Sequence, residues 1–571
     1  MLLKIFLFSI SFLFLYAADD EISTPPHVEK SISSVTIKKY ALCHQLVEYK
    51  KTKHFSHLND PVQTAGFYAN FCKNSDNFAW FEKDLSLTPQ AQEMLWSIDD
   101  SYNYGLNPQK YHKGELTFNL DRLKNEIFES NKKKISLTNE IDILFTDAYL
   151  SMAHDLYYGF TDWGKFQNAT INDAPIAWER QIKQPIYAQK RLFSSLRKNN
   201  IKHSLQTLNP DFKEYGQLVK ALAFYRSLEE TEKITKIPLG PSIRLNYTDE
   251  RLPLIKQRLF ETQDLLEIKN PEQTIYNETD LIDAVKKFQA RNNLASDGLI
   301  GKKTVQIMNI SATDRIQKII LNLERFRSLK NDLEKKDVYL NVNIPAYSMQ
   351  VFEKGNELFH MNVIVGSKDR PTPILSSKLS YAVLNPTWTA PQTIVQEDIL
   401  GKKNLLQYLQ KHNMHIYRQT NGEMIEQDPK KIDWEPYIQA GAAPFTFKAD
   451  SGKKNPLGTV KFIFPNKYSI YMHDTNTRGL FNNEYRALSS GCVRLGEPKK
   501  LLTYLSPKED IITKDTQEEM RVDLAKRAPI LIRYMTVGVD ANQKVCFYDD
   551  IYGYDDLQLQ MINKINFAKC D

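Results

Sequence analysis

The fold is decided near the C-terminal end, by two short stretches that read Tyr471-Met472-His473-Asp474-Thr475 and Ser489-Ser490-Gly491-Cys492-Val493-Arg494. The first stretch overlaps the end of a segment, residues 468–472, whose apolar pattern predicts a β-strand. The second places a cysteine directly after a glycine and two residues before an arginine. Because reactive side chains need rigid support, we expect both stretches to lie in a β-rich domain.

Cys492 is the candidate nucleophile, because a thiol ionises near a pKa of about 8.5 and attacks as the thiolate. His473 lies 19 residues upstream and is the only histidine after His415, so we predict that it accepts the thiol proton. Arg494 would add positive charge. Backbone amides around Gly491 and Cys492 would bind the oxyanion that forms after attack. These residue types predict a cysteine-dependent acyl-transfer enzyme.

Two other interpretations of the same residues remain open. Cys492 could be a buried structural cysteine and His473 a hydrogen-bonded core histidine. A zinc site is the other alternative, but one histidine and one cysteine lack the further ligands that such a site needs at characteristic spacing. These residues therefore predict no metal site.

Outward from these stretches, the C-terminal third of the chain predicts a β-rich catalytic domain over residues 337–535. Strands are predicted from apolar alternation at residues 338–344, 347–352, 358–366, 379–384, 458–464, 468–472 and 529–534. A polar, helix-prone insertion of nearly 70 residues separates Trp388 from Gly458. Long excursions of this kind are typically functional, so we predict a lid over about residues 392–450.

The rest of the chain is predicted to be mostly helical, so the fold class is a multidomain α+β protein. Residues 41–250 predict a helical scaffold domain that includes a helix over 140–159. Residues 251–312 predict a compact unit of three helices, and 313–336 a linker helix. Residues 536–571 are expected to be a C-terminal tail.

The compact unit resembles the peptidoglycan-binding domain type 1, a small three-helix module. The resemblance rests on Ala284-Val285-Lys286-Lys287-Phe288-Gln289 and on Asn293-Leu294, Asp297-Gly298, Gly301 and Thr304. An ordinary helical hairpin joined by an Asp-Gly turn is the alternative. The resemblance implies that this unit binds peptidoglycan.

The histidine followed by a Ser-x-Gly-Cys-hydrophobic-Arg box resembles the YkuD-type L,D-transpeptidases, and the wider match is closer to the large YcbB-type subfamily. The phrases that carry the wider resemblance are Thr146-Asp147-Ala148-Tyr149-Leu150, Asn322-Leu323-Glu324-Arg325, Asn341-Val342-Asn343-Ile344-Pro345, Val365-Gly366, Thr372-Pro373, Asn385-Pro386-Thr387-Trp388, Asn455-Pro456-Leu457-Gly458, Lys461-Phe462 and His473-Asp474-Thr475. The resemblance covers the chain from about residue 78 onward.

This resemblance implies an enzyme that makes 3→3 cross-links in peptidoglycan. Cys492 would attack the diaminopimelate carbonyl of a tetrapeptide stem, release D-Ala and form a thioester. The side-chain amine of a second stem's diaminopimelate would then resolve the thioester. An L,D-carboxypeptidase that uses water in the second step is one alternative, and a non-catalytic peptidoglycan-binding protein is another.

By the same resemblance, His473 is the proton acceptor and later donor, and Ser489, Ser490, Gly491 and Arg494 complete the catalytic motif. Many family members carry a second histidine where this chain has Ser490, which leaves His473 as the base. Before Asn455 the expected Gly- and Pro-rich phrase is replaced by residues 449–454. The substrate is predicted to contact two further residues, Tyr471 and Trp388.

Length and composition agree with a soluble, folded chain of several domains. The chain has 571 residues, of which 42% are hydrophobic and 25% charged, and its net charge is +6. These values are ordinary for globular proteins and argue against wholesale disorder and against several membrane spans. So weak a positive charge on a chain of this size does not indicate a nucleic-acid partner.

The N-terminus predicts export. A basic start at Lys4 precedes the apolar run 5–18, which is too short to span a bilayer and is typical of a secretory signal peptide. We predict a signal peptide over residues 1–17, a flexible lead-in over 18–40 and a periplasmic location. An uncleaved signal that anchors the protein to the membrane is the alternative.

Five cysteines in an exported chain leave at least one unpaired. We predict disulfides Cys43–Cys72 and Cys546–Cys570, which close short loops and keep Cys492 reduced for catalysis. The sequence alone also permits other pairings.

Overall fold

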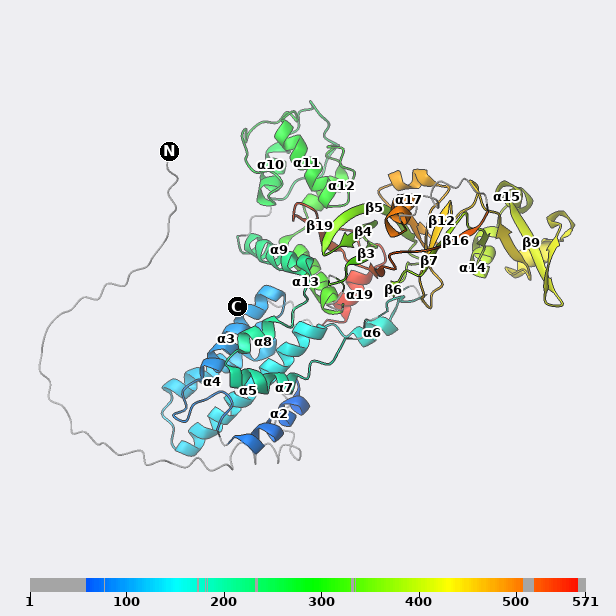
Figure 1. Cartoon of the computed structure of the whole chain (residues 1–571). Helices are drawn as coiled ribbons and strands as arrows, with labels where there is room; N and C mark the ends of the chain where they lie inside the picture. Colours follow the sequence, from blue (N-terminus) through cyan, green and yellow to red (C-terminus); the bar gives the residue numbers. More distant parts are fainter. Residues whose placement is uncertain are drawn as a thin grey trace, which may run out of the picture.

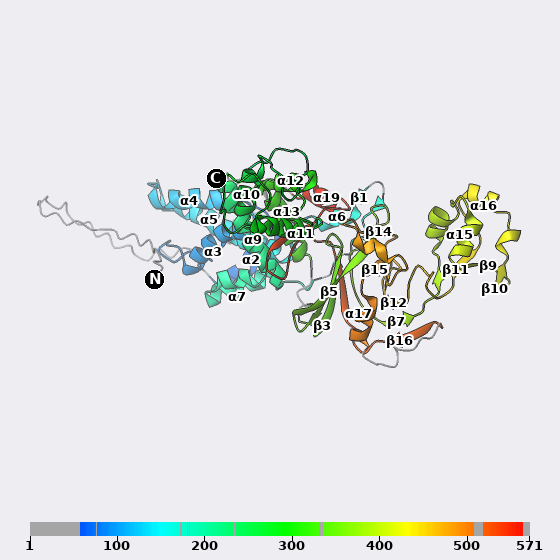
Figure 2. The same ribbon diagram turned by 90° about the horizontal axis from the view of Figure 1, so that it is seen from above.

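The computed structural model describes residues 58–562 apart from residues 76, 172–173, 180, 182, 232–234, 330–332, 334 and 507–517. The predicted signal peptide and lead-in, Cys43 and Cys570 lie outside these residues. Figure 1 shows a helical region at one end, a three-helix unit above the middle, and a β-rich region from which an insertion projects. Figure 2, seen from above, again places the insertion at the end far from the helical region.

The N-terminal helices pack around one long buried helix, α5 (Asn131–Tyr158). Ser130 caps α5 by accepting a hydrogen bond from the amide of Lys133, and Gly159 follows its end at φ +82°. The predicted helix at 140–159 is confirmed, but it begins earlier, at Asn131. The prediction missed this start because the first turn of the helix is polar and shows no apolar stripe. The other helices packed around α5 are α2 (Pro61–Asn74), α3 (Pro89–Asp100), α4 (Lys113–Asn125), α7 (Ala188–Lys198) and α8 (Ile201–Gln206). Helix α6 (Trp163–Asn168) instead contributes Trp163 and Phe166 to the core of the β-rich region.

Two helices, α9 (Lys213–Glu230) and α13 (Ala312–Arg327), join the helical region to the β-rich region. They pack on each other and share a hydrophobic cluster with Tyr339 and Leu531 of the β-rich region. The predicted scaffold domain therefore contains α9, a helix that packs with the linker helix rather than in the core around α5.

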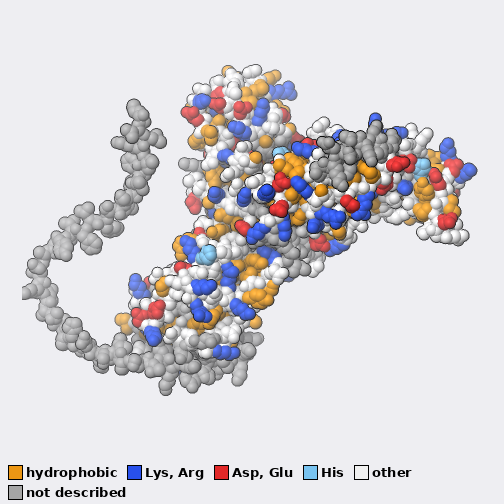
Figure 3. Space-filling view, in the orientation of Figure 1, with side chains coloured by type: hydrophobic (Ala, Val, Ile, Leu, Met, Phe, Trp, Pro, Cys, Tyr) orange, Lys and Arg blue, Asp and Glu red, His pale blue; other side chains and the backbone are white. Residues whose placement is uncertain are grey.

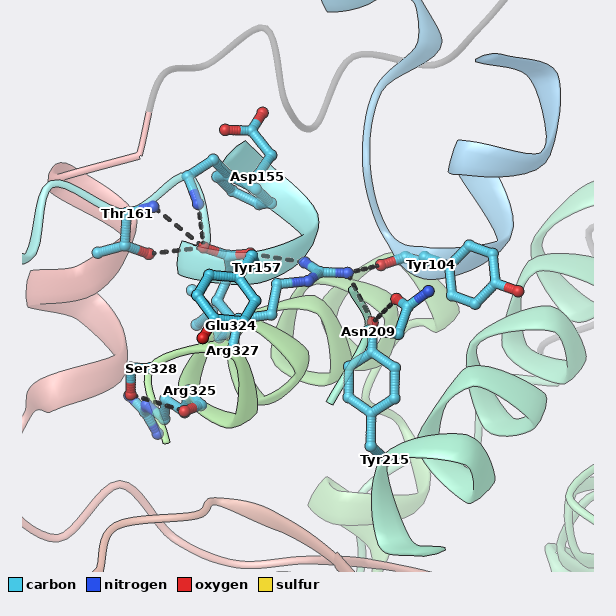
Figure 4. Close-up of polar contacts among 12 residues, drawn as sticks. Tyr104, Asp155, Tyr157, Thr161, Asn209, Tyr215, Glu324, Arg325, Arg327 and Ser328 are labelled. Atoms are coloured by element: carbon cyan, nitrogen blue, oxygen red, sulfur yellow. Dashed lines mark hydrogen bonds and ion pairs between the residues drawn. The ribbon is translucent and has the colours of Figure 1, made fainter. Parts of the chain in front are cut away.

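A buried charged cluster on α13 fixes this junction (Figure 4). The Glu324 carboxylate accepts hydrogen bonds from the amides of Phe160 (2.6 Å) and Thr161 (3.0 Å) and pairs with Arg327 (2.6 Å). Arg327 also donates to the hydroxyl of Tyr215 on α9 at 2.9 Å. Because a buried charge is tolerated only when it is paired and hydrogen-bonded, these contacts hold three segments in one arrangement.

The segment 251–312 folds as three helices, as its pattern predicted, and the hydrophobic core of this unit also includes Ile237 and Ile243, which precede the segment. The helices are α10 (Leu252–Glu261), α11 (Thr279–Arg291) and α12 (Lys302–Met308). Gln289 on α11 closes the turn between the second and third helices, because its side chain donates to Asp297 (3.0 Å) and accepts from the amide of Gly298 (2.9 Å). Gly298 has φ +78°, which explains the glycine at this position.

The β-rich region is one curled sheet in the order β16-β7-β12-β13-β15-β5-β4-β3-β17-β6, with β14 paired to β5. Six of the seven predicted strands are confirmed to within two residues at each end, as β3 (Val338–Asn343), β4 (Ser348–Glu353), β5 (Asn356–Gly366), β7 (Tyr381–Leu384), β12 (Val460–Ile463) and β17 (Pro529–Arg533). Within this sheet, the strands that the pattern missed are only three or four residues long: β6 (Leu375–Lys378), β14 (Ala487–Ser489), β15 (Val493–Leu495) and β16 (Met520–Asp523). The pattern also missed the strands of the insertion, which begin with the two-residue β8 (Trp388–Thr389).

The seventh strand is shorter than predicted, because β13 spans only Met472–His473 instead of 468–472. Asn466 holds the preceding residues in a turn by accepting from the amides of Tyr468 and Ile470, both at 3.1 Å. Ser469 within this turn has φ +56°, which a β-strand does not allow.

The insertion contains a four-stranded sheet in the order β10-β9-β11-β8, so its description as helix-prone is only partly right. Its strands β9 (Met414–Thr420) and β10 (Glu423–Gln427) are joined by Asn421-Gly422, both at positive φ, the two-residue turn typical of hairpins. With β11 (Thr446–Ala449) and the short helices α14 (Gln392–Ile394), α15 (Leu405–Lys411) and α16 (Glu435–Ala440), they enclose a separate hydrophobic core.

The segment predicted as a C-terminal tail is folded as far as residue 562. Strands β18 (Val537–Val539) and β19 (Val545–Phe547) pair with each other, and helix α19 (Tyr554–Gln560) packs on α13. Arg325 of α13, fully buried, donates to Gln558 (2.9 Å) and pairs with Asp555 (2.7 Å). The segment is therefore a structural part of the junction.

The cysteines differ in part from the prediction. Cys546 lies in β19 as a free, buried thiol close to the carbonyl of Lys544 (3.8 Å), which contradicts the predicted Cys546–Cys570 disulfide. Its side chain is buried, at 6% exposure. Cys492 is also free, as predicted. Cys72 is disulfide-bonded, with its partner outside the described residues, so the pair Cys43–Cys72 stays a prediction.

On the face seen in Figure 3, Lys and Arg side chains are interspersed with Asp and Glu. This distribution agrees with the small net charge. Among the residues that the structure describes, none of the helices combines the length and apolarity needed to span a bilayer.

Candidate active site

The pairing of β13 with β15 brings the predicted nucleophile and base together. The two strands are parallel, with Met472 opposite Val493 and His473 opposite Arg494. Because paired positions of neighbouring strands share a face, the side chains of His473 and Arg494 lie on one face of the sheet. Tyr471 and Cys492 directly precede the two strands, and the backbone of Tyr471 hydrogen-bonds both to the amide of Val493 (3.2 Å) and to the Cys492 side chain. The 19-residue separation in sequence thus becomes the spacing between two adjacent strands.

His473 is oriented to act as a base. It is buried, and its Nδ1 lies 2.5 Å from the backbone oxygen of Asp474. Because a carbonyl only accepts hydrogen bonds, Nδ1 must carry the proton, which leaves Nε2 of the neutral ring free to accept one. Burial, and secondarily the nearby positive charge of Arg494, lower the pKa of His473 to about 3, so the ring is neutral at physiological pH.

Cys492 is likewise neutral at rest. Burial raises the pKa of its thiol to about 11, although a hydrogen bond from the backbone of Tyr471 and the charge of Arg494 oppose this shift. The site therefore holds a thiol beside a neutral imidazole rather than a preformed ion pair. Chemically, such a pair can deliver a thiolate only as the proton moves to the ring during attack.

The turn before the nucleophile is held by hydrogen bonds at successive residues. The Ser489 hydroxyl donates to the carbonyl of Cys492 (2.5 Å) and accepts from the amide of Gly491 (3.2 Å). Thr372 donates to the carbonyl of Gly491 at 2.8 Å. Gly491 has φ +106°, so a side chain here would strain the turn. Ser490 is half-buried and lies between Ser489 and Gly491, the two residues that these hydrogen bonds hold.

These bonds refine the predicted oxyanion site. The amide of Gly491 is already engaged by Ser489, so it is not available to a substrate in this conformation. The amide of Cys492 has no acceptor among the residues described. It is the backbone donor here that a developing negative charge could use.

Arg494 supplies positive charge beside the thiol. Its guanidinium donates to the hydroxyl of Thr477 at a long 3.5 Å, and its Nε is buried without a partner among the described residues. Burial lowers the pKa of Arg494, and the neighbouring Cys492 raises it. A charge held this loosely can stabilise an anion that forms at Cys492.

The two predicted substrate-binding residues lie beside the nucleophile and connect it to the insertion. Tyr471 packs against the core of the insertion, and its ring lies 5.6 Å from that of His473. Trp388 hydrogen-bonds to Tyr471, whose pKa is raised chiefly by burial. Trp388 itself is only 8% exposed. In this structure Trp388 therefore reaches the site through Tyr471, and direct contact with substrate stays a prediction.

Sequence reasoning missed the residues that support the turn from behind. Thr372 accepts from the amide of Gly366 (2.7 Å), and the hydroxyl of Tyr552 accepts from the amide of Thr372 (3.1 Å). Thr372 belongs to one of the phrases behind the family resemblance, whereas no sequence signal points to Tyr552. Arg370 in the same loop forms a bidentate ion pair with Asp398 of the insertion (2.5 and 3.0 Å).

No cluster of three or more His, Cys, Asp or Glu side chains among the described residues is arranged to hold a metal ion. The parallel strand pair places a thiol, a neutral imidazole and an arginine close together, and these are groups suited to acyl transfer.

Comparison with known families agrees with this chemistry. Residues 337–513 match the model described as the L,D-transpeptidase catalytic domain (YkuD), and residues 63–222 match the model described as the Scaffold domain. The chain thus carries a YkuD L,D-transpeptidase catalytic domain, preceded by a helical region.

Individual relatives agree with the family match. A Haemophilus influenzae protein provisionally named an L,D-transpeptidase is 34% identical over 279 residues, which cover 46% of this chain and 54% of the relative. The chain thus spans about half the length of this curated relative.

Among solved structures, an L,D-transpeptidase from Mycobacterium smegmatis is 15% identical over 34% of this chain and 58% of its own, with a TM-score of 0.18. One from Stackebrandtia nassauensis is 14% identical over 53% of this chain and 96% of its own, with a TM-score of 0.20. At such scores these superpositions carry no argument.

Proposed function

We propose that the protein is an L,D-transpeptidase that forms 3→3 peptidoglycan cross-links through a thioester on Cys492. The observation that carries this proposal is the His473 ring, whose Nδ1–H is held by the Asp474 carbonyl while Nε2 is left to accept a proton, on the strand adjacent to the one that Cys492 precedes. The match of residues 337–513 supports the substrate class.

In the first step the Cys492 sulfur attacks the diaminopimelate carbonyl of a tetrapeptide stem while its proton moves to Nε2 of His473. The oxyanion forms close to the amide of Cys492 and the charge of Arg494. When the carbonyl re-forms, the C–N bond to D-Ala breaks and the imidazolium protonates the departing amine.

In the second step the side-chain amine of another diaminopimelate attacks the thioester. His473 takes the amine proton, and the C–S bond breaks. The proton then returns to sulfur, which regenerates the thiol. Every proton is accounted for by these two side chains, so no metal or organic cofactor is required.

The test is incubation of the purified protein with disaccharide-tetrapeptide, followed by mass analysis of the products. A cross-linked dimer is the expected result. Tripeptide alone would establish an L,D-carboxypeptidase, in which water resolves the thioester. Unchanged substrate would leave the non-catalytic peptidoglycan-binding protein.

We further propose that the insertion acts as a lid that excludes water during the second step, since a thioester must be shielded if an amine is to compete with water. Two contacts support this role. Trp388 and Tyr471 connect the core of the insertion to Cys492, and Asp398 binds Arg370, whose loop also carries Thr372 and so holds Gly491.

Disrupting the Arg370–Asp398 pair is therefore expected to shift products from dimer toward tripeptide. Asp398→Asn and Arg370→Gln each remove a charge from a partly exposed pair, whose worth is on the order of 1 kcal/mol, so the fold should survive. We expect a several-fold change in the dimer-to-tripeptide ratio and normal acylation of Cys492. The measurement is the product ratio at equal acylation.

The matched control is Glu423→Gln, which removes an exposed charge from β10 at the far hairpin of the insertion. A wild-type product ratio in both pair variants would contradict the lid. Trimming residues 399–412 would be a poorer test of the lid, because Leu405 and Leu409 belong to the core of the insertion.

We also propose that the protein is exported to the periplasm by its N-terminal signal, and that the three-helix unit over residues 251–312 binds peptidoglycan. Support for both proposals comes from the sequence pattern. Its partners would be tetrapeptide donor stems and the diaminopimelate amine of acceptor stems.

A further inference from the structure

The residue after the base, Asp474, is bound more tightly than any role in the mechanism above requires. Its carboxylate is buried, at 5% exposure. One oxygen accepts from both the amide and the hydroxyl of Thr459, each at 2.9 Å. The other oxygen accepts from Arg478, which in turn donates to the carbonyl of Gly496 next to β15.

The segment that contacts this carboxylate, residues 455–459, has a backbone conformation that leaves room for it. Gly458 has φ +62°, and a β-carbon there would lie 2.5 Å from the carboxyl carbon of Asp474. The turn is closed by Asn455, whose side chain accepts from the amide of Leu457 (2.8 Å) and donates to the carbonyl of Pro386 (3.0 Å). Residues 455–458 therefore form a turn that accommodates the Asp474 carboxylate only when residue 458 is glycine.

Asp474 is also held through its backbone. Its amide donates to the carbonyl of Val460 at 2.9 Å, and its own carbonyl receives the Nδ1 proton of His473. With the amide and both carboxylate oxygens bound, the Cα of Asp474 is held in place, and the following peptide unit, which carries this carbonyl, extends from a fixed position. The direction of the carbonyl decides which ring nitrogen of His473 keeps the proton.

We infer that Asp474 is a positioning residue that acts through His473. The hydrogen bonds from Thr459 and Arg478 to its carboxylate orient its backbone carbonyl. That carbonyl keeps the proton of His473 on Nδ1, which leaves Nε2 free to accept the proton of Cys492. This inference rests on the proposed role of His473 as the base. It assigns a function to Arg478 and Thr459, which do not lie in the Ser-x-Gly-Cys-x-Arg box.

Asp474→Asn is the decisive variant, because it keeps the size of the side chain and changes only its hydrogen bonding. The asparagine side chain has only one acceptor oxygen, so either Thr459 or Arg478 must face its NH₂ group. One of the two sets of hydrogen bonds to residue 474 is then lost. We expect acylation of Cys492 by a carbapenem to slow by about 10–100-fold, the scale seen when a partner that orients a functional histidine is lost. Thr459→Val and Arg478→Gln should give smaller losses in the same direction.

Two measurements distinguish this positioning role of Asp474 from a purely structural one. In a His473→Ala background, Asp474→Asn should cause no further loss, since the base through which it acts is gone. Nitrogen-15 NMR of histidine-labelled protein should show His473 protonated at Nδ1 in the wild type and partly at Nε2 in Asp474→Asn. Asp523→Asn, an exposed aspartate on β16, serves as the control and should change neither readout.

Wild-type tautomer and wild-type acylation rate in Asp474→Asn would overturn the inference, as would an undiminished loss in the His473→Ala background. If Asp474→Asn does not fold, the two milder variants decide by the same measurements, because Arg478 is half exposed and Thr459→Val nearly conserves volume. The NMR readout needs no substrate. Failure of transpeptidation in the wild type would therefore be recognised separately from failure of this inference.

Discussion

Replacing Cys492 with alanine is expected to abolish turnover and leave the fold intact. The substitution removes only the sulfur, and the turn is held through Ser489, Gly491 and Thr372 rather than through the thiol. The loss of stability should be about 1 kcal/mol, as for deletion of one buried methyl group. Without sulfur no thioester can form, so neither dimer nor tripeptide should appear from disaccharide-tetrapeptide.

Intact-mass spectrometry after incubation with a carbapenem provides a second measurement. The wild type should gain one adduct, and Cys492→Ala none. Cys546 supplies the matched control, because it is the other free thiol within the described part of the chain. Burial raises the pKa of Cys546 to about 12, so it should be unreactive, and Cys546→Ala should behave as the wild type does. An adduct that persists in Cys492→Ala would refute the assignment of the nucleophile.

Replacing His473 with alanine is expected to slow acylation of Cys492 by about 10²–10⁴-fold, the usual contribution of a positioned general base. The effect should be large here because burial holds the thiol pKa near 11, so almost no thiolate forms at neutral pH without a base. Binding of substrate should survive. The measurement is the single-turnover rate of carbapenem acylation at equal occupancy.

The pH dependence follows from the neutral resting state. His473 can accept a proton only when it is unprotonated, so the acylation rate should rise as pH increases through its pKa of about 3 and then level off. A second rise is expected only as the thiol ionises near about 11. Between about pH 5 and 9 the rate should be flat, in contrast to the bell shape of a preformed ion pair.

In His473→Ala this plateau should be replaced by a rate that increases with pH across the same range, since hydroxide then has to generate the thiolate. A plateau that survives in the variant, or a bell-shaped profile in the wild type, would mean that another group activates Cys492.

Much of the β-rich region could be predicted because its strands are buried on at least one face. Strands such as 338–343 and 460–463 carry apolar side chains at alternating positions, a local signal that needs no knowledge of their partners. In the insertion this signal fails, because β10 is almost entirely exposed and its two apolar residues, Met424 and Ile425, are adjacent instead of alternating. Its Asn421-Gly422 turn was the cue that would have identified the hairpin.

The reactive residues could also be identified by type, yet their working state could not. Cys492 and His473 stand out by their spacing and their neighbours in sequence, and the structure places them on adjacent strand segments. That the thiol is neutral and the imidazole unprotonated depends on burial by strands distant in sequence. The free state of Cys546 has the same origin, since short spacing to Cys570 predicted a disulfide whereas packing of β19 buries the thiol.

The sequence by itself determined the period-two strands, the three-helix unit, and the residue types of the candidate site, because these depend on side chains close together along the chain. Only the tertiary structure decided that β13 and β15 pair in parallel, that Asp474 is gripped by Thr459 and Arg478, and that α9 and the C-terminal segment belong to the junction around α13. These features arise from contacts between distant segments, which depend on the packing of the whole chain and on the burial of charge that it imposes.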